Sequence, residues 1–329
     1  MSDKLAEVWE QYDMEVVSTG KGRGMTILRT DRGVRVLQPF VTSESRLEQE
    51  ALLKEAIYQA GYRYIDRFVR NREEELITCD RYHTPFVLKE YFEGRECNIR
   101  QESDMIAAVE NLARLHLVLQ KIENPVHQKE LKTLYSFRRH NQELKRVRGY
   151  MRQKPTKSEF DYLYLSCYET FYGQAEEVVR ELEQVQEGLV KRRWFYCHGA
   201  YHQHNVLILK EGIATVNFER FMVDNQLVDL YTFLRKAMEK NEYQWELLFR
   251  LIEAYSKYMN LVEEDYVFLY YLLRYPEKFW KISNQYNNMN KAWIPPKTYE
   301  KLQTVIRQDA IKQQLLEQYV RHYGLNLQK

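Results

Sequence analysis

The side chains best placed for chemistry lie in two short segments of the chain. The first, residues 198–205, contains three imidazoles and one amide, namely His198, His202, His204 and Asn205. In the second segment Asn217 follows Asn205 by twelve residues. Imidazole moves protons and binds metals, and an asparagine offers a neutral carbonyl oxygen to a hard cation. The pattern therefore raises the hypothesis of a polar site that handles protons or a metal ion.

One β-hairpin is predicted to hold both segments. Residues 206–209 and 213–216 have strand-like composition and are joined by the turn 210–212. A hairpin brings its two ends together, so both segments can face one point. A metal site made by the three histidines is the less favoured interpretation, because no cysteine motif accompanies them. We expect His198 to be a packed structural residue.

This arrangement resembles the catalytic loop and metal-binding strand of the aminoglycoside phosphotransferases and choline kinases, a branch of the protein-kinase-like fold. In that group an aspartate after His-Gly is the base, and an asparagine and a later aspartate hold magnesium. Here the base position is Ala200, the asparagine is kept as Asn205, and Asn217 replaces the metal-binding aspartate. Ala200 cannot accept a proton, and a neutral amide is a poorer magnesium ligand than a carboxylate.

The resemblance extends to the N-terminal part, where the family has a glycine-bearing hairpin, a lysine strand and a helix with a glutamate. Residues 20–24 match the hairpin turn, and the lysine position falls on Gln38 in the expected strand 34–40. Glu50 occupies the glutamate position in a helix expected to begin near Thr42 or Ser43. The resemblance implies that Glu50 has lost its basic partner. The alternative is that Glu50 is a solvated helix residue.

Segments around these positions also follow the family pattern. Residues 86–94 resemble the hinge strand between the two lobes, and residues 105–116 read as the helix that follows it. Past the metal strand, Asp229 matches the aspartate that ties down the catalytic loop. The resemblance implies that Asp229 and His198 anchor this loop, with backbone N–H groups near His198 as the partners of Asp229.

A narrower resemblance is to the CotS-type spore coat proteins of endospore-forming bacteria. It rests on residues 21–24, the turn 30–33, the loop 198–205 and residues 216–221, and extends from about residue 15 to about residue 323. The implied fold class is α+β, in a two-lobed protein-kinase-like (aminoglycoside phosphotransferase-like) form. Residues 1–91 are expected to form a small antiparallel sheet with one helix, and residues 92–329 a mostly helical lobe.

The changes at Gln38, Ala200 and Asn217 imply a degenerate phosphotransferase, or pseudokinase, which serves the spore coat as a binding scaffold. Losing a general base alone typically costs roughly 10²- to 10⁴-fold in rate. No cofactor or metal is then expected. The protein would be made in the cytoplasm of the mother cell and assembled into the coat with other coat proteins.

Two other functions remain open. One is an ATP- and magnesium-dependent small-molecule kinase of the aminoglycoside, choline or homoserine kinase type with an unconventional site. Its metal would be recruited by one of four residues, Asn205, Asn217, Glu219 or Asp224. The other is a nucleotide-binding regulator without turnover.

Composition argues against several classes of protein. The 49 basic and 47 acidic residues give a net charge of +2, which predicts no nucleic-acid partner. No apolar run is long enough to span a membrane, and the charged N-terminus lacks the apolar stretch of a signal peptide. The cysteines show no close pairing, as expected for reduced thiols in a cytoplasm; they are Cys79, Cys97, Cys167 and Cys197.

Two features could serve an interface. Nine basic residues lie between Lys132 and Lys157 and are opposed there only by Glu143. They could dock an acidic partner, with the most clustered cations being Arg138, Arg139, Lys145, Arg146 and Arg148, or they could form a solvated helix face. The 26 tyrosines against 14 phenylalanines could likewise serve contacts or oxidative crosslinking, or could be half-buried in a helical lobe.

Overall fold

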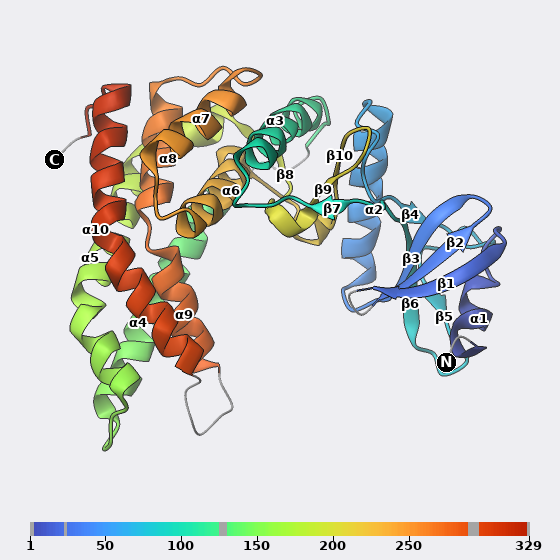
Figure 1. Ribbon diagram of the computed structural model, residues 1–329, viewed down its shortest axis with the longest axis horizontal. Coiled ribbons are helices and arrows are strands. Elements are labelled where there is room, and N and C mark those ends of the chain that lie inside the picture. The colour runs from blue at the N-terminus through green and yellow to red at the C-terminus, as the bar shows by residue number, and fades with distance from the viewer. Residues whose placement is uncertain (1–2, 23–24, 125–129, 289–295, 328–329) are drawn as a thin grey trace. The chain divides into compact units, whose positions relative to one another are not determined.

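The computed structural model describes residues 3–22, 25–124, 130–288 and 296–327, which form two compact units (Figure 1). Unit 1 comprises Met1–Asn98, Arg114–Glu123 and His198–Phe221. Unit 2 comprises Ile99–Ala113, Asn124–Cys197 and Met222–Lys329. The predicted loop and hairpin at 198–221 thus belong to the same unit as the N-terminal sheet. The lobe boundary expected near residue 91 stays a prediction.

Unit 1 contains the small antiparallel sheet that the sequence predicted, with strand order β1-β2-β3-β6-β4 and β5 also paired to β6. The strands are β1 (Val16–Gly22), β2 (Met25–Thr30), β3 (Gly33–Pro39), β4 (Phe68–Val69), β5 (Thr78–Cys79) and β6 (Pro85–Glu90). Arg23 and Gly24 of the predicted glycine-bearing turn lie outside the described residues.

The two faces of this sheet have different partners. On one face Leu28, Leu37 and Leu88 pack with Val8 of helix α1 (Asp3–Trp9) in a buried cluster. Because side chains alternate along a strand, the opposite face presents the neighbouring residues of β3 and β6. The register sets Val36 opposite Lys89 and Gln38 opposite Val87, so these four side chains share that second face.

Helix α2 (Glu44–Gln59) begins where the sequence predicted, with Ser43 as its N-cap. The Ser43 hydroxyl accepts a hydrogen bond from the Arg46 N–H at 3.4 Å. The buried face of the helix consists of Leu47, Glu50, Leu53, Lys54 and Ile57. Two of these five buried residues are charged, which is unusual unless the charges are paired. Glu50 is only 3% exposed, so the alternative that it is a solvated helix residue is wrong.

A second, three-stranded sheet completes unit 1, with strand order β10-β9-β7. It consists of β7 (Arg95–Glu96), β9 (Val206–Ile208) and β10 (Ile213–Thr215), flanked by the single turns η1 (Gln203–Asn205) and η2 (Phe218–Arg220). The β9–β10 pair is the predicted hairpin. Thr215 is joined to the segment after α2 through its N–H, which donates to Tyr64 O at 3.0 Å. Figure 1 shows α2 between this hairpin and the larger sheet.

Unit 2 is mostly helical, as the resemblance implied. Most of α3 (Glu102–Leu119) belongs to it, together with α4 (Lys132–Gln153), α5 (Glu159–Arg192), α6 (Leu227–Lys240), α7 (Trp245–Ser256), α8 (Glu263–Arg274), α9 (Glu277–Asn287) and α10 (Pro296–Tyr323). A two-stranded sheet pairs β8 (Trp194–Cys197) with β11 (Met222–Asn225). Within the described ranges, no helix has the length and hydrophobicity needed to cross the bilayer.

Acidic residues of α5 oppose the basic cluster of α4, and a docking role for this cluster stays a prediction. Ion pairs connect Arg148 to Glu169, Lys145 to Glu176 at 3.9 Å, and Arg138 to Glu183 at 2.7 Å. Arg139 pairs with Glu143 on its own helix at 3.6 Å. In the part of the chain that the structure describes, Arg146 is the one of the five candidate docking cations without such a partner. We refer to the three α4–α5 pairs as the charge ladder.

The tyrosines are divided between the core and the surface. Several are fully buried, among them Tyr164, Tyr168, Tyr255 and Tyr275 in unit 2. Others are well exposed, namely Tyr82, Tyr135, Tyr150 and Tyr162. Core packing therefore accounts for part of the tyrosine content, and a role for the exposed tyrosines in the coat stays a prediction.

Candidate functional site

The loop after β8 has a backbone that only glycine permits at its second position. Gly199 has φ +74°, and a Cβ atom there would lie 1.9 Å from Arg220 O. Next to it, His198 is fully buried. Its Nδ1 accepts the Ala200 N–H at 3.2 Å, so Nε2 bears the proton and donates to Val216 O at 3.0 Å. Both ring nitrogens are thus engaged by the backbone, which leaves neither one to bind a metal.

The positions that would hold a base and a magnesium ion are occupied by groups that bond to one another. Asn205 Nδ2 donates to Ala200 O at 3.0 Å, and Asn217 Nδ2 donates to Asn205 Oδ1 at 3.0 Å. Asn217 has a left-handed backbone, with φ 65°, which asparagine tolerates better than most residues. The sequence correctly placed the two amides near each other. Their mutual hydrogen bond provides no carboxylate for magnesium, so this set of ligands does not fit that ion.

A buried ion cluster lies behind this loop, and it corrects the expectation that Glu50 has no basic partner. Lys54 Nζ lies 2.7 Å from Glu50 Oε1 and 3.0 Å from Asp66 Oδ1. All three residues are less than 5% exposed. Burial lowers the pKa of Lys54, but the charges of Asp66 and Glu50 outweigh it, and the net direction is upward.

Asp66 connects this cluster to the candidate site. Its Oδ2 accepts the backbone N–H of Asn217 at 3.1 Å, while its Oδ1 faces Lys54. Sequence reasoning missed both residues. Lys54 had a detectable signal, because it lies one helical turn after Glu50 on the same face. Asp66 had none, because it lies in the irregular segment between α2 and β4.

A second buried lysine lies on the strand next to Gln38. Lys89 is 2% exposed, and its position opposite Val36 places it on the same sheet face as Gln38. Its Nζ lies 3.7 Å from Glu219 Oε1, which is longer than a hydrogen bond. Burial lowers the pKa of Lys89, and the nearby charge of Lys54 lowers it further. Sequence reasoning missed Lys89, although strand alternation alone predicts that it shares a face with Val87.

Gln38, Lys89 and Asn217 meet at a small cavity, which we call the inner cavity. Its volume is about 100 Å³. The other residues that line it are Met25, Val36, Asp66, Glu90, Tyr91, Phe92, Gly94, His204, Leu207 and Val216. The structure thus brings together two of the predicted positions, Gln38 and Asn217, and adds a lysine from a different strand.

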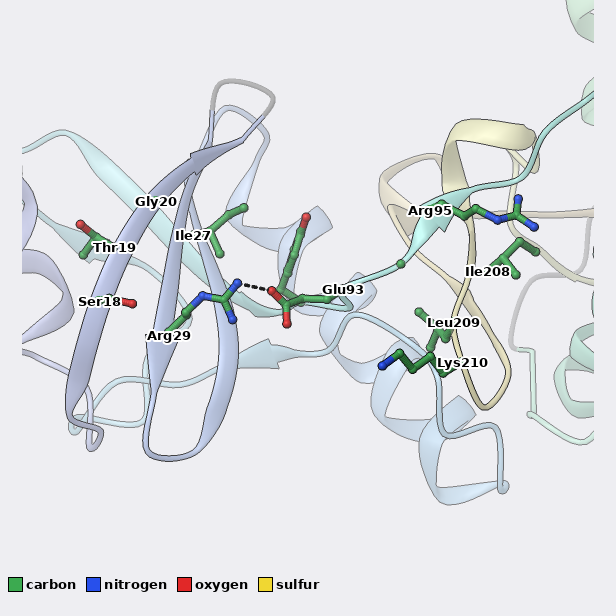
Figure 2. Close-up of a pocket in the computed structure, with 12 residues that line it drawn as sticks. Ser18, Thr19, Gly20, Ile27, Arg29, Glu93, Arg95, Ile208, Leu209 and Lys210 are labelled. Carbon is green, nitrogen blue, oxygen red and sulfur yellow. Dashed lines mark hydrogen bonds and ion pairs between the residues drawn. The ribbon is translucent and has the colours of Figure 1, made fainter.

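A larger and more open cavity lies beside it, and we call it the outer cavity (Figure 2). Its volume is about 660 Å³, within the usual range for sites that hold small molecules. Figure 2 shows the β1–β2 face on one side, the β9–β10 hairpin on the other, and Arg29 pointing to Glu93, with which it forms an ion pair. Tyr91 and Gly94 line both cavities. A Cβ at Gly94 would lie 2.9 Å from the backbone oxygen Ile208 O, so this approach to the hairpin favours glycine.

The remaining candidate metal ligands have other surroundings. Asp224 is fully buried in β11, where its Oδ2 accepts the Thr133 N–H at 2.9 Å and the Thr133 hydroxyl at 2.7 Å. Burial raises the pKa of Asp224 to about 6. Glu219 is half exposed in η2. Among the described residues, no three or more His, Cys, Asp or Glu side chains are arranged as metal ligands.

Asp229 lies in the first turn of α6 and is fully buried. A buried carboxylate must have polar partners, so the burial of Asp229 agrees with a structural role. Its predicted role as the anchor of the loop beginning at His198 stays a prediction.

Solved structures with the same fold are phosphotransferases. The chain is similar to an aminoglycoside phosphotransferase from Alicyclobacillus acidocaldarius, with a TM-score of 0.80 and 16% identity over 97% of this chain and 96% of that one. It is similar to spectinomycin phosphotransferase APH(9)-Ia, crystallised with ADP and spectinomycin, with a TM-score of 0.66 and 10% identity over 95% and 98%. It is also similar to a microcompartment-associated aminopropanol kinase, with a TM-score of 0.65 and 14% identity over 98% of each chain. At these identities the likeness confirms the kinase-like fold alone.

One family model matches residues 6–319, which is nearly the whole chain, and is described as "Spore coat putative kinase YutH". This match confirms the resemblance to spore coat proteins that the loop and turn motifs indicated. None of the curated proteins matches the chain in sequence.

Proposed function

Because the chain belongs to the YutH family of spore coat kinase-like proteins, we propose that it is a non-catalytic coat component that uses a degenerate kinase fold as a binding scaffold. It is made in the mother cell and assembled into the coat through contacts with other coat proteins. A kinase-like fold alone does not imply catalysis.

The hydrogen bond between Asn205 and Asn217 is the observation that supports this proposal most strongly. The two amides satisfy each other at 3.0 Å, at the positions where an active relative would hold magnesium. The base position is Ala200, and Glu50 is neutralised by Lys54 from its own helix. Phosphoryl transfer depends on metal and charged groups that stabilise the transferring phosphate. Two amides that already bond to each other at these positions provide little such stabilisation.

A phosphotransfer assay tests the absence of catalysis. The purified protein is incubated with ATP and magnesium or manganese, with choline, an aminoglycoside, homoserine or casein as acceptor. We expect no transfer above the level of a heat-inactivated sample. The matched variants are Asn205→Ala and Asn217→Ala. Turnover of ATP that disappears in either variant would overturn the proposal.

The coat assignment has a separate test. A fluorescent fusion of the unaltered protein is followed through sporulation, and we expect it to collect around the forespore. Asn217→Ala should localise in the same way, because the proposal assigns no role in assembly to the degenerate site. A diffuse signal from the unaltered protein in the mother cell would contradict the assignment.

The second candidate is an ATP-dependent small-molecule kinase with an unconventional site. The outer cavity favours it, since a volume of about 660 Å³ is large enough for a nucleotide or a small acceptor. In this case Glu219, which is half exposed and lies 3.7 Å from Lys89, provides a carboxylate for the metal, and Glu219→Gln would abolish the transfer measured in the assay above. Asp224 is a poorer candidate, because Thr133 and the N–H of Asn225 already occupy its oxygens.

A further inference from the structure

The solvent-exposed side of α4 has the composition of a protein interface. Its exposed residues recur at every third or fourth position, so they share one side of the helix. They are Tyr135, Arg139, Gln142, Arg146, Tyr150 and Gln153, and we call them the outer stripe. The opposite, buried side of α4 packs against α5 and α9 (Figure 1). Exposed positions are usually rich in lysine and glutamate, whereas tyrosine and arginine are enriched at interfaces. The outer stripe contains neither lysine nor glutamate.

The two tyrosines of the stripe leave large rings in water. Tyr135 is 61% exposed and Tyr150 is 57% exposed, although Tyr164 and Tyr168 of the neighbouring helix are buried. A tyrosine ring provides a large contact area and loses little conformational entropy when a partner covers it. The rings lie fifteen residues apart along the same side of α4, so one elongated partner could cover both.

Both arginines of the stripe have N–H donors that the described residues leave unused. Arg139 lies 3.6 Å from Glu143, which is longer than a hydrogen bond, and Glu143 already accepts the indole N–H of Trp280 at 2.7 Å. Arg146 has no ion-pair partner within the described part of the chain. The structure therefore divides the basic cluster of α4 in two. The charge ladder is satisfied by α5, and the outer stripe is not.

A glycine within the stripe is not required by the packing of the chain itself. Gly149 lies inside α4, where glycine is less favourable than alanine. A Cβ atom at this position would have no neighbour within 4 Å. The missing side chain, next to Arg146 and Tyr150, allows another chain to approach the helix closely.

We propose that the outer stripe docks an acidic segment of another coat protein. Arg139 and Arg146 bind its carboxylates, and Tyr135 and Tyr150 cover its apolar side chains. A guanidinium binds a carboxylate through two parallel hydrogen bonds. The same stripe of a second copy would set arginine against arginine, which disfavours symmetric pairing. Two arginines are too few for a nucleic-acid backbone, which is bound through many phosphate contacts. This inference rests on the proposed scaffold function, and it names the docking surface and the charge of the partner.

Charge reversal in sporulating cells tests the stripe. The double variant Arg139→Glu/Arg146→Glu is followed as the fluorescent fusion, and the matched control is Arg307→Glu/Arg321→Glu on α10. The two control side chains are 67% and 77% exposed, and each forms an ion pair at 3.4 Å. We expect the ratio of forespore to mother-cell signal to fall by about tenfold or more in the stripe variant only, because arginines contribute strongly to many interfaces. Both purified variants should melt within about 4 °C of the unaltered protein, since exposed charges affect stability little.

A glycine pair tests the close approach. Leucine favours the helix more than glycine does, so Gly149→Leu leaves α4 folded but fills the space that the partner needs. Gly173→Leu is the control, at an exposed position inside α5 with equally open surroundings. We expect forespore localisation to be lost with Gly149→Leu and kept with Gly173→Leu. Normal localisation of Gly149→Leu would overturn the close approach at this residue.

A photocrosslink tests the chemistry of the partner. Tyr150 is replaced by the photoreactive benzoylphenylalanine, sporulating cells are irradiated, and the crosslinked peptide is sequenced by mass spectrometry. We expect a peptide of another protein that carries several aspartates or glutamates. A peptide without acidic residues, a peptide of this same chain, crosslinked nucleic acid, or no crosslink would overturn the proposal, and this result decides even if the arginine variant does not fold. A diffuse signal from the unaltered fusion would refute the scaffold proposal, whereas normal localisation of the folded arginine variant would refute this inference alone.

Discussion

The buried ion cluster of unit 1 and the charge ladder of unit 2 use the same chemistry in different surroundings. In the cluster, Lys54 and its two carboxylate partners are almost completely removed from water. In the ladder, the side chains of Arg148 and Glu169 are 32% and 69% exposed. Both networks neutralise charges that looked unpaired in the sequence. Only the cluster has no water to replace a lost partner.

This difference in exposure determines how much each network contributes to stability. An exposed ion pair contributes little, because water solvates either partner when the other is removed. A buried pair contributes little when it forms but is costly to break, since an uncompensated charge is then left inside the protein. The cluster thus fixes α2 to the segment before β4 and to Asn217, whereas the ladder pairs opposite charges on partly exposed side chains of α4 and α5.

The largest effect should come from removing the central cation of the buried cluster. Lys54→Met leaves Glu50 and Asp66 without a partner, so we expect the free energy of unfolding to fall by about 3 to 5 kcal/mol in urea titrations. Adding Glu50→Gln should recover part of this loss. Arg148→Met, the matched change in the ladder, should cost about 1 kcal/mol or less. Equal costs for the two single variants would break the comparison.

The next largest effect is a loss of stability at low pH, which is caused by a buried histidine without an ion-pair partner. In unit 2, His140 is 7% exposed, stacks on Trp280 at 3.4 Å, and burial lowers its pKa to about 4 from 6.5. The unfolded chain binds a proton below pH 6.5 while the folded protein does not, so stability is lost as the pH falls from 6.5 to 4. The loss due to His140 should reach about 3 kcal/mol at pH 4.

The variant His140→Phe keeps a ring against Trp280 and removes the titration. Its free energy of unfolding, measured at pH 7 and pH 4, should fall less than that of the unaltered protein over this range. Carboxylates that titrate near pH 4 affect both proteins alike. An identical pH dependence of the two would show that His140 is not buried in its neutral form.

A smaller effect is expected at Asp229, a buried carboxylate outside both networks. If it anchors the loop beginning at His198, Asp229→Ala leaves N–H groups unpaired and should cost about 1 to 3 kcal/mol, measured as the free energy of unfolding. Asp229→Asn keeps an acceptor oxygen and should cost less. Unfolding of Asp229→Ala at the same denaturant concentration as the unaltered protein would remove the anchoring role.

The smallest effect concerns the ladder itself. Lys145→Ala should change the free energy of unfolding by about 0.2 to 1 kcal/mol, and by less at high salt, because exposed pairs are screened. Arg146→Ala should have no measurable effect on stability, since that side chain has no partner among the described residues. If Arg146→Glu alone prevented coat localisation of the fluorescent fusion, the unpaired arginine would be a docking residue after all.

The sequence alone determined the local structure and the chemical groups at the candidate positions. Strand alternation, the turn at 210–212 and the Ser43 cap depend on neighbours along the chain, so they predicted the hairpin and α2. Whether a side chain can accept a proton or offer a carboxylate depends on its own atoms, so the sequence alone showed that Ala200 cannot be a base and that Asn217 offers only a neutral oxygen.

The tertiary structure decided which charged and polar groups meet. Lys54 reaches Asp66 only because the chain turns back after α2, and Lys89 faces the same cavity as Gln38 only because β3 and β6 are neighbours in the sheet. The acids that oppose the α4 cations lie on another helix. Such contacts join residues far apart in the sequence, and their positions depend on strand register and helix packing. Neither the strand register nor the helix packing can be predicted from the local pattern of residues.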